Sequence, residues 1–537
     1  MAAVLFGFAA IACSSPEKMA EMAENVTVKC EPAVLEVVAG EINSSVSVTY
    51  PEDYFHPKAI LEVTPVLVYE GGEAKMEPFM FQGEKVEDNY QVVPAAGATV
   101  TKNVKFAYAP GMEKSYLELR GVVKYKKKVI DLPTKKVADG ANTTYMLICK
   151  KGKLSLKADN YQEIIKQTEE GQVLYQINSS VVRNSQTKSQ SVKDFLAAVE
   201  AVKAHERKTL VSTDVVAYAS PDGKEDQNNT LSDNRSKSAE KAFNKITKKN
   251  PFGVPVNVTS IGEDWEGFQE LVAASDLEDK DLIIRVLSMY SDPAVREQEI
   301  KNMSAIYKTL AKDVLPELRR ARFIANVEFT NYSNEELLKL IEENIDVLDE
   351  TAILRAATLV KDNDQKVALY KKAVEKFNSA NGQYNLAVTY IKMDKVAEAK
   401  ATLAKCADDA DVKNAKGIVA LLEGNNAEAA KLFKAAANAD ANENLAIVDV
   451  LNGDYKAAAA KVANAKGYNA ALIALLNGNT APAAALKCEC PCSAYLRAIA
   501  AARQGDAAGV KKNLEAASKC KKLAERAAKD IEFAQFN

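Results

Sequence analysis

The stretch Leu421-Leu-Glu-Gly-Asn-Asn-Ala-Glu-Ala429 decides the fold of the carboxyl-terminal part of this chain, because its frame returns along the sequence. The further copies are Val450-Leu-Asn-Gly-Asp-Tyr-Lys-Ala-Ala458, Leu475-Leu-Asn-Gly-Asn-Thr-Ala-Pro-Ala483 and Ala502-Arg-Gln-Gly-Asp-Ala-Ala-Gly509. Their glycines, Gly424, Gly453, Gly478 and Gly505, are spaced by 29, 25 and 27 residues, and an earlier copy has Asp394 at this place. A glycine that ends one helix in the left-handed conformation, followed by an alanine-rich helix, predicts stacked helix pairs.

This pattern resembles tetratricopeptide (TPR) repeats, although the units are shorter than the usual length of about 34 residues. The resemblance implies an all-α solenoid over residues 333–537, whose concave surface takes an extended peptide or a partner helix. Asn442, Asn444, Tyr468 and Asn469 are the expected lining of that groove. A plain helical bundle is the alternative interpretation of the same pattern.

Residues 25–149 alternate with the period of strands. Leu61 and Val63 alternate with polar neighbours, as do Leu117 and Leu119. Turn signals separate the short strands, at Gly71-Gly72, Ala109-Pro-Gly111 and Asp139-Gly140. This spacing predicts an antiparallel β-sandwich.

Residues 150–332 mix strand and helix patterns. The expected order is strand, helix, strand, helix, strand, a helical insertion and a last strand at Arg322–Phe329. The second helix is expected to begin near Leu231, after the turn Ala219-Ser-Pro-Asp-Gly223. The sequence therefore predicts an α+β domain with a helical insertion.

The start of that helix resembles the OmpA-like peptidoglycan-binding signature N-x-x-L-S-x-x-R-A. The matching positions are Asn228, Leu231, Ser232 and Arg235, with serine where the family has alanine. The resemblance implies that Arg235 and Asn228, with the turn residues Ser220 and Asp222, bind a peptidoglycan stem peptide. An exposed Arg235 paired with Asp233 or Glu240 is the alternative.

The amino terminus resembles a bacterial lipoprotein signal peptide. Met1 to Ala12 is apolar and ends in Ala10-Ile-Ala12 before Cys13, which matches a lipobox. The resemblance implies lipidation of Cys13, a tether up to residue 24 and residence at the outer membrane, on its periplasmic face or at the cell surface. The segments Gly262–Gly267, Leu318–Arg322 and Leu61–Leu67 are similar to envelope lipoproteins of Bacteroidetes. A cytosolic protein with an apolar terminus is the alternative.

Seven further cysteines follow Cys13. Cys30 and Cys149 bracket the first predicted domain and are disulfide candidates in an oxidising periplasm. Cys488-Glu-Cys-Pro-Cys492 lacks the paired spacing of structural zinc sites, so a disulfide or free thiols are expected there rather than a metal.

The composition excludes several classes of function. Lys plus Arg at 70 against Asp plus Glu at 73 gives a net charge of −3, which does not favour nucleic acid as a partner. The chain has two histidines and lacks nucleotide-loop, zinc-protease and serine-hydrolase motifs. We therefore predict no catalytic residues, cofactor or metal. We therefore expect a non-catalytic scaffold that binds envelope proteins through its repeats. The alternative is a tether that joins the outer membrane to peptidoglycan.

Overall fold

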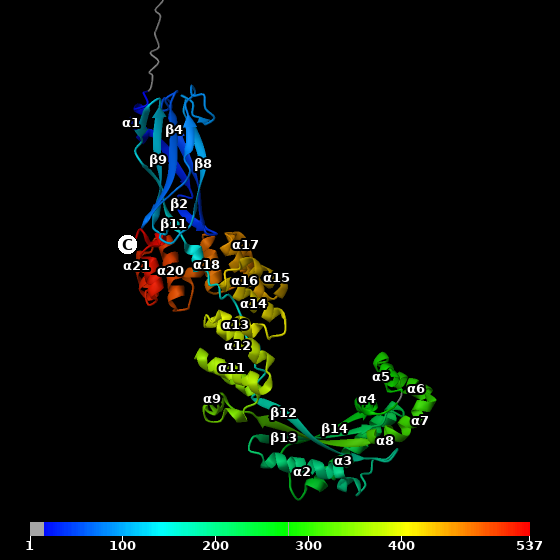
Figure 1. The fold of residues 1–537 in the computed structure, drawn as a ribbon. Coiled ribbons are helices and arrows are strands. Elements are labelled where there is room, and N and C mark those ends of the chain that lie inside the picture. The colour runs from blue at the N-terminus through cyan, green and yellow to red at the C-terminus, as the bar shows by residue number, and fades with distance from the viewer. Residues whose placement is uncertain (1–14, 278, 537) are drawn as a thin grey trace, which may run out of the picture. The chain divides into compact units, whose positions relative to one another are not determined.

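The computed structural model describes residues 15–277 and 279–536 (Figure 1). The chain divides into two compact units. The first joins the chain up to Ala158 to the chain from Lys361 onward, and the second is Asp159–Val360. The structure thus assigns residues 150–158 to the first unit, and it assigns the helices between residues 333 and 360 to the second.

The amino-terminal part of the first unit is one curled sheet. Strand β2 pairs with β3 in one layer and with β11 in the other, so the two layers of the predicted sandwich are continuous. The pairs β2–β11 and β6–β7 are parallel, which corrects the prediction of a wholly antiparallel sheet. The strands are β1 (Thr27–Glu31), β2 (Val34–Val38), β3 (Glu41–Tyr50), β4 (Ile60–Tyr69), β5 (Gly72–Lys75), β6 (Phe79–Gln82), β7 (Gln91–Val92), β8 (Ala98–Ala107), β9 (Ser115–Tyr125), β10 (Lys128–Asp131) and β11 (Lys135–Asn142). Helix α1 (Lys18–Glu21) precedes them.

The core of this sheet follows the predicted alternation. Leu61, Leu117 and Leu119 are buried, as expected. The predicted turn at Asp139-Gly140 is wrong, because both residues lie inside β11. A side chain at Gly140 would collide with Leu35, so this glycine permits close packing instead of a turn.

The carboxyl-terminal part of the first unit consists of paired helices, as the repeat pattern predicted. Gly424, Gly453, Gly478 and Gly505 have φ between 74° and 84°, and Asp394 has φ of 60°. Each lies at the turn between the two helices of a pair, so their left-handed conformation is confirmed. The helices are α11 (Asn363–Phe377), α12 (Ala380–Lys392), α13 (Val396–Leu403), α14 (Ala410–Leu422), α15 (Asn426–Ala436), α16 (Ala439–Leu451), α17 (Tyr455–Lys461), α18 (Tyr468–Leu476), α19 (Ala481–Ala484), α20 (Pro491–Arg503), α21 (Ala507–Ala517) and α22 (Lys521–Ala527).

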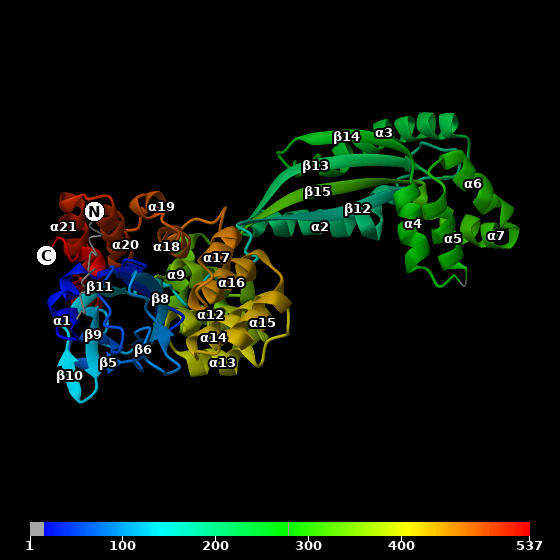
Figure 2. The ribbon, with the colours of Figure 1, turned by 90° about the horizontal axis from the view of Figure 1, so that it is seen from above.

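The second unit contains a four-stranded sheet in the order β12-β15-β13-β14 (Figure 2). Helices α2 and α3 pack on it through Phe195 and Phe243, which meet Phe323 of β15. The chain order of these elements is the predicted one. The strands and helices are β12 (Ile164–Leu174), α2 (Gln190–Ala204), β13 (Lys208–Ala219), α3 (Glu225–Thr247), β14 (Val256–Glu263), α4 (Trp265–Ala274), α5 (Lys280–Met289), α6 (Pro293–Asn302), α7 (Ser304–Asp313), α8 (Leu315–Leu318), β15 (Arg320–Thr330), α9 (Asn334–Glu343) and α10 (Glu350–Leu359). No helix in the described part of the chain has both the length and the apolarity needed to cross a membrane.

Candidate functional site: a peptide groove in the helical repeats

The segment that follows the curled sheet runs along the helical repeats (Figure 1). We call residues 147–158 the strap. At one end Tyr468 Oη of α18 donates to Leu147 O at 3.0 Å, and at the other Asn381 Nδ2 of α12 donates to Ala158 O at 3.1 Å. The strap therefore runs from α18 to α12, opposite to the order of the repeats.

Three asparagine side chains each bind both polar groups of one strap residue. Asn469 accepts from Cys149 N and donates to Cys149 O, both at 2.9 Å. Asn444 makes the same pair of bonds to Lys153, at 2.7 and 2.9 Å. Asn385 makes them to Lys157, at 2.8 and 3.0 Å. The bound strap residues are four apart, and the chain turns between the first two, where Gly152 N donates to Cys149 O at 3.3 Å.

This geometry depends on the carboxamide group. It offers an acceptor and two donors in one plane, which match the N–H and C=O of a single extended residue. Asn414 supports the central contact, because its Nδ2 donates to Lys153 O at 3.1 Å and its Oδ1 accepts from Asn444 at 2.9 Å. Asn385, Asn414 and Asn444 are each only 1% exposed, so the strap satisfies groups that water cannot reach. These asparagine contacts are made to backbone groups, which every residue has, so by themselves they do not select a side chain.

The charges of the strap and the groove are complementary. Lys153 Nζ lies 2.7 Å from Glu443, and this bond raises the pKa of Lys153. Lys157 pairs with Asp409. Burial alone would raise the pKa of Asp409, but the bond from Lys157 and its charge outweigh burial and lower it. Because these pairs are partly exposed, they orient the strap more than they stabilise it.

Gly152 is the point of closest approach. Its φ is +54°, and a Cβ there would collide with Asn444 Oδ1 and with Ile418. The backbone of the strap can lie this deep in the groove only because residue 152 has no side chain.

Sequence reasoning found part of this site. Tyr468, Asn469 and Asn444 contact the strap as expected, whereas Asn442 is exposed on α16. Asn385 was missed. A signal was present, because the three clamping asparagines each lie nine positions before the left-handed turn residue of their repeat. What the sequence did not indicate is that the bound peptide belongs to the same chain.

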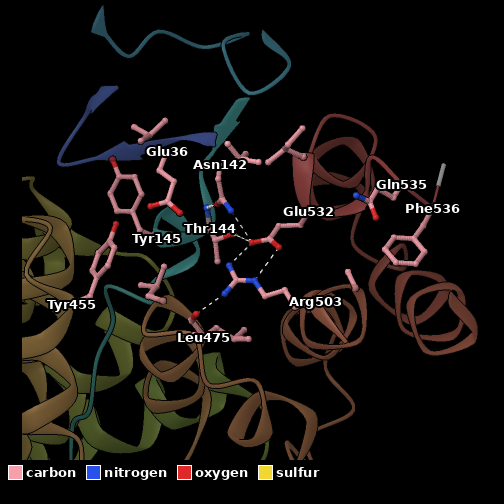
Figure 3. Close-up of a pocket in the computed structure, with 16 residues that line it drawn as sticks. Glu36, Asn142, Thr144, Tyr145, Tyr455, Leu475, Arg503, Glu532, Gln535 and Phe536 are labelled. Carbon is pink, nitrogen blue, oxygen red and sulfur yellow. Dashed lines mark hydrogen bonds and ion pairs between the residues drawn. The ribbon is translucent and has the colours of Figure 1, made fainter. Parts of the chain in front are cut away.

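A second set of contacts, around a polar cavity of about 470 Å³, joins the sheet to the last helices (Figure 3). Glu532 accepts hydrogen bonds from Asn142 Nδ2 at 2.8 Å, Thr144 Oγ1 at 2.9 Å and Arg503 Nε at 3.0 Å. Burial alone would raise the pKa of Glu532, but the bonds and charge of Arg503 outweigh it and lower that pKa. Desolvation raises the pKa of Glu36, which lines the same cavity.

The residues predicted to bind peptidoglycan lie in the second unit, where β13 ends and α3 begins. Ser220 Oγ donates to Asp222 Oδ1 at 2.5 Å, and Asn228 Nδ2 donates to Ser220 O at 3.2 Å. Arg319, which was not predicted, lies 3.2 Å from Asp222. The structure therefore brings Ser220, Asp222 and Asn228 together with an arginine from another element.

Arg235 lies on the same helix but is only 1% exposed. Its Nε, Nη1 and Nη2 donate to the backbone oxygens of Ser179, Tyr218 and Gln176 at 3.0, 2.8 and 3.4 Å. The guanidinium also packs on the ring of Tyr175, and burial lowers the pKa of Arg235 to about 10. In this structure Arg235 donates to backbone carbonyl groups. Neither of the two sequence-based interpretations, a peptidoglycan ligand or an exposed ion pair, includes these contacts.

The disulfide candidates Cys30 and Cys149 are both free thiols in this structure. Cys30 lies within β1 opposite Val46, whereas Asn469 holds the backbone of Cys149 in the groove. The two cysteines therefore lie in different parts of the first unit. Cys13, the predicted lipidation site, lies outside the described residues.

Comparison with known proteins adds little to these observations. No protein-family model matches the chain, and no curated protein matches it. Among solved structures, the chain matches YrrB, described as a TPR protein with an unusual peptide-binding site, over 37% of this chain and 100% of that chain. The identity is 18% and the TM-score is 0.20. The assignment of TPR-like repeats therefore rests on the helix pairs and their left-handed turns.

Proposed function

We propose that this protein is a non-catalytic scaffold of the cell envelope, a lipoprotein of the Bacteroidetes kind whose TPR-like repeats bind another envelope protein. Cys13 anchors it by lipid to the outer membrane, on the periplasmic face or at the cell surface. The observation that supports a binding role is the stack of paired helices, which already holds one segment of its own chain by backbone groups through its asparagines.

The strap already fills the groove between α12 and α18, so the partner binds elsewhere on the repeats. The last helices offer a charged surface for it. Arg526 points inward, where its Nη2 donates to Thr143 O at 2.8 Å. The lysines around it are exposed, namely Lys511, Lys512, Lys519, Lys521, Lys522 and Lys529. This surface, which we call the lysine patch, favours a partner with an acidic face.

Crosslinking in cells that make the full-length protein tests the partner. We expect a crosslinked protein that is lost when five patch lysines are changed to glutamate, namely Lys511, Lys512, Lys519, Lys521 and Lys522. The matched control reverses five exposed lysines on other helices and loops of the repeats, namely Lys405, Lys431, Lys434, Lys456 and Lys466. Equal crosslinking of both variants contradicts the proposed surface.

Mass spectrometry of the mature amino terminus tests the anchor separately. The expected product begins at an acylated Cys13, and it partitions with membranes until the acyl chains are removed. A mature protein that retains an unmodified Met1 and stays in the cytosol contradicts the envelope location.

The alternative function is an OmpA-like tether that binds peptidoglycan. It is favoured by the cluster of Ser220, Asp222 and Asn228, to which Arg319 is added at 3.2 Å from Asp222. A charged pair of this kind suits a zwitterionic stem peptide. Sedimentation with purified sacculi, compared between the wild type, Arg319→Ala and the control Arg322→Ala, tests it. Equal pelleting of the three proteins argues against a tether.

A further inference from the structure

Four cysteines from two distant stretches of the sequence gather around one cavity of the first unit. Cys149 of the strap lines a cavity of about 1130 Å³ together with Cys488, Cys490 and Cys492. The rest of the cavity is largely apolar, with Val462, Ile473 and Leu486 among its walls. The CECPC motif therefore faces a space that a ligand could enter.

Cys490 lies beside polar groups at the start of a helix. It is the residue before α20, so its side chain lies at the amino terminus of a helix of 13 residues. Cys490 Sγ donates to Ser493 Oγ at 3.3 Å, a hydroxyl that can donate in return once the thiol has lost its proton, and Cys490 N donates to Cys488 Sγ at 3.3 Å. Helix amino termini and hydroxyl donors stabilise a thiolate over a thiol.

The pKa of Cys490 and the pKa values of Cys492 and Cys406 are shifted in opposite directions. Burial alone would raise the pKa of Cys490, but hydrogen bonding with Cys488 and Ser493 outweighs it and lowers that pKa. Burial raises the pKa of Cys492 and of Cys406. Its place at the amino terminus of α20, 3.3 Å from Ser493 Oγ, makes Cys490 the candidate nucleophile of the cluster, and the thiol that its backbone N–H contacts is Cys488.

We propose that Cys490 and Cys488 form a dithiol site that reacts with a disulfide-bearing molecule bound in this cavity. In the first step the Cys490 thiolate attacks one sulfur of the disulfide, forms a mixed disulfide with it and releases the other sulfur as a thiolate. In the second step Cys488, after losing its proton to solvent, attacks Cys490 Sγ and releases the bound sulfur. The disulfide is reduced to two thiols, and the two cysteines are oxidised to one disulfide.

The arrangement suits this chemistry better than metal binding. In the described part of the chain, no three Cys, His, Asp or Glu side chains are placed to hold a metal ion. Disulfide exchange needs only two sulfurs that can meet, and a cavity that admits the substrate. Cys488 and Cys490 are exposed, so the first thiolate is accessible to it.

Stopped-flow reaction of the reduced full-length protein with 5,5′-dithiobis(2-nitrobenzoate) tests the site. We expect one fast phase at neutral pH, on the order of tenfold faster than the reaction of the other thiols. Mass mapping of a quenched sample should place the first adduct on Cys490. Cys490→Ser should abolish the fast phase. Cys488→Ser should keep it but leave the mixed disulfide unresolved, and the control Cys492→Ser should keep both steps.

Two further substrates distinguish the source of the disulfide. Fast oxidation of the pair by oxidised glutathione indicates a small-molecule substrate, and fast oxidation only by a disulfide-bonded peptide indicates a protein. The proposal is overturned if neither oxidises the pair, if the fast phase survives Cys490→Ser, or if all thiols react at one rate. Circular dichroism of each serine variant must match the wild type, so a lost phase cannot result from unfolding.

Discussion

Gly152→Ala is the sharpest test of the groove. The substitution adds one methyl group to the strap, at a position where φ is +54° and where that methyl collides with Asn444 Oδ1 and Ile418. Gly505→Ala is the matched control. Gly505 has φ of +74° and open space around its missing Cβ, so alanine there bears the left-handed strain without a collision.

The two substitutions should differ clearly in their effect on the free energy of unfolding. The left-handed conformation costs alanine about 1 kcal/mol at either position. At Gly152 the carboxamide of Asn444 must also move, which breaks its bonds to Lys153 at 2.7 and 2.9 Å. Each bond contributes about 1 kcal/mol. We expect a loss of about 3 kcal/mol for Gly152→Ala and about 1 kcal/mol for Gly505→Ala.

Calorimetry of the full-length chain measures this difference, together with limited trypsin digestion. The Tm of the first unit should fall by about 4–5 °C for Gly152→Ala and by about 1–2 °C for Gly505→Ala. Because the strap carries Lys151, Lys153 and Lys157, trypsin should cut it in the first variant well before the second. Equal melting shifts and equal cleavage would refute the conclusion that the strap is held in the groove.

Three further outcomes are expected. Asn444→Ala should destabilise the first unit by about 2 kcal/mol in denaturant titrations, because two strap bonds are lost, whereas the exposed Asn442→Ala should change it by less than about 0.5 kcal/mol. Arg235→Lys should lower the melting temperature of the second unit with a loss of about 2–4 kcal/mol, because an ammonium group cannot reach the three carbonyls that the guanidinium binds. Glu532→Gln should lose about 2 kcal/mol at neutral pH by weakening the pair with Arg503. Because the pKa of Glu532 is lowered in the folded chain, this difference should be complete above the unfolded pKa of about 4.3 and shrink as pH falls through the folded value, which urea midpoints at several pH values measure.

The local features of the fold could be predicted because their causes are local. The left-handed turns at Gly424 and Gly453 depend on a residue without a Cβ, and the burial of Leu61 and Leu117 follows from strand alternation. The turn expected at Asp139-Gly140 failed for a tertiary reason, since Gly140 packs against Leu35 from another strand.

The candidate site could be predicted only in part. The groove was expected from the repeats, and Asn444 and Asn469 were placed in it. The peptide it holds was not foreseen, because Cys149 and Asn469 are 320 positions apart and nothing in either neighbourhood indicates the other. The same is true of Arg235, whose partners are carbonyl groups that every residue has.

The sequence by itself determined where helices and strands form and where each repeat turns, since these depend on the residue at each position and on its near neighbours. Tertiary structure alone decided that the strap occupies the groove, that Arg235 is buried, and that Cys149 joins the CECPC thiols around one cavity. The physical reason is that backbone amides, carbonyls and thiols are the same chemical groups wherever they occur, so the local sequence does not show which distant group each one contacts. Their pairing is set only when the folded chain excludes water from them.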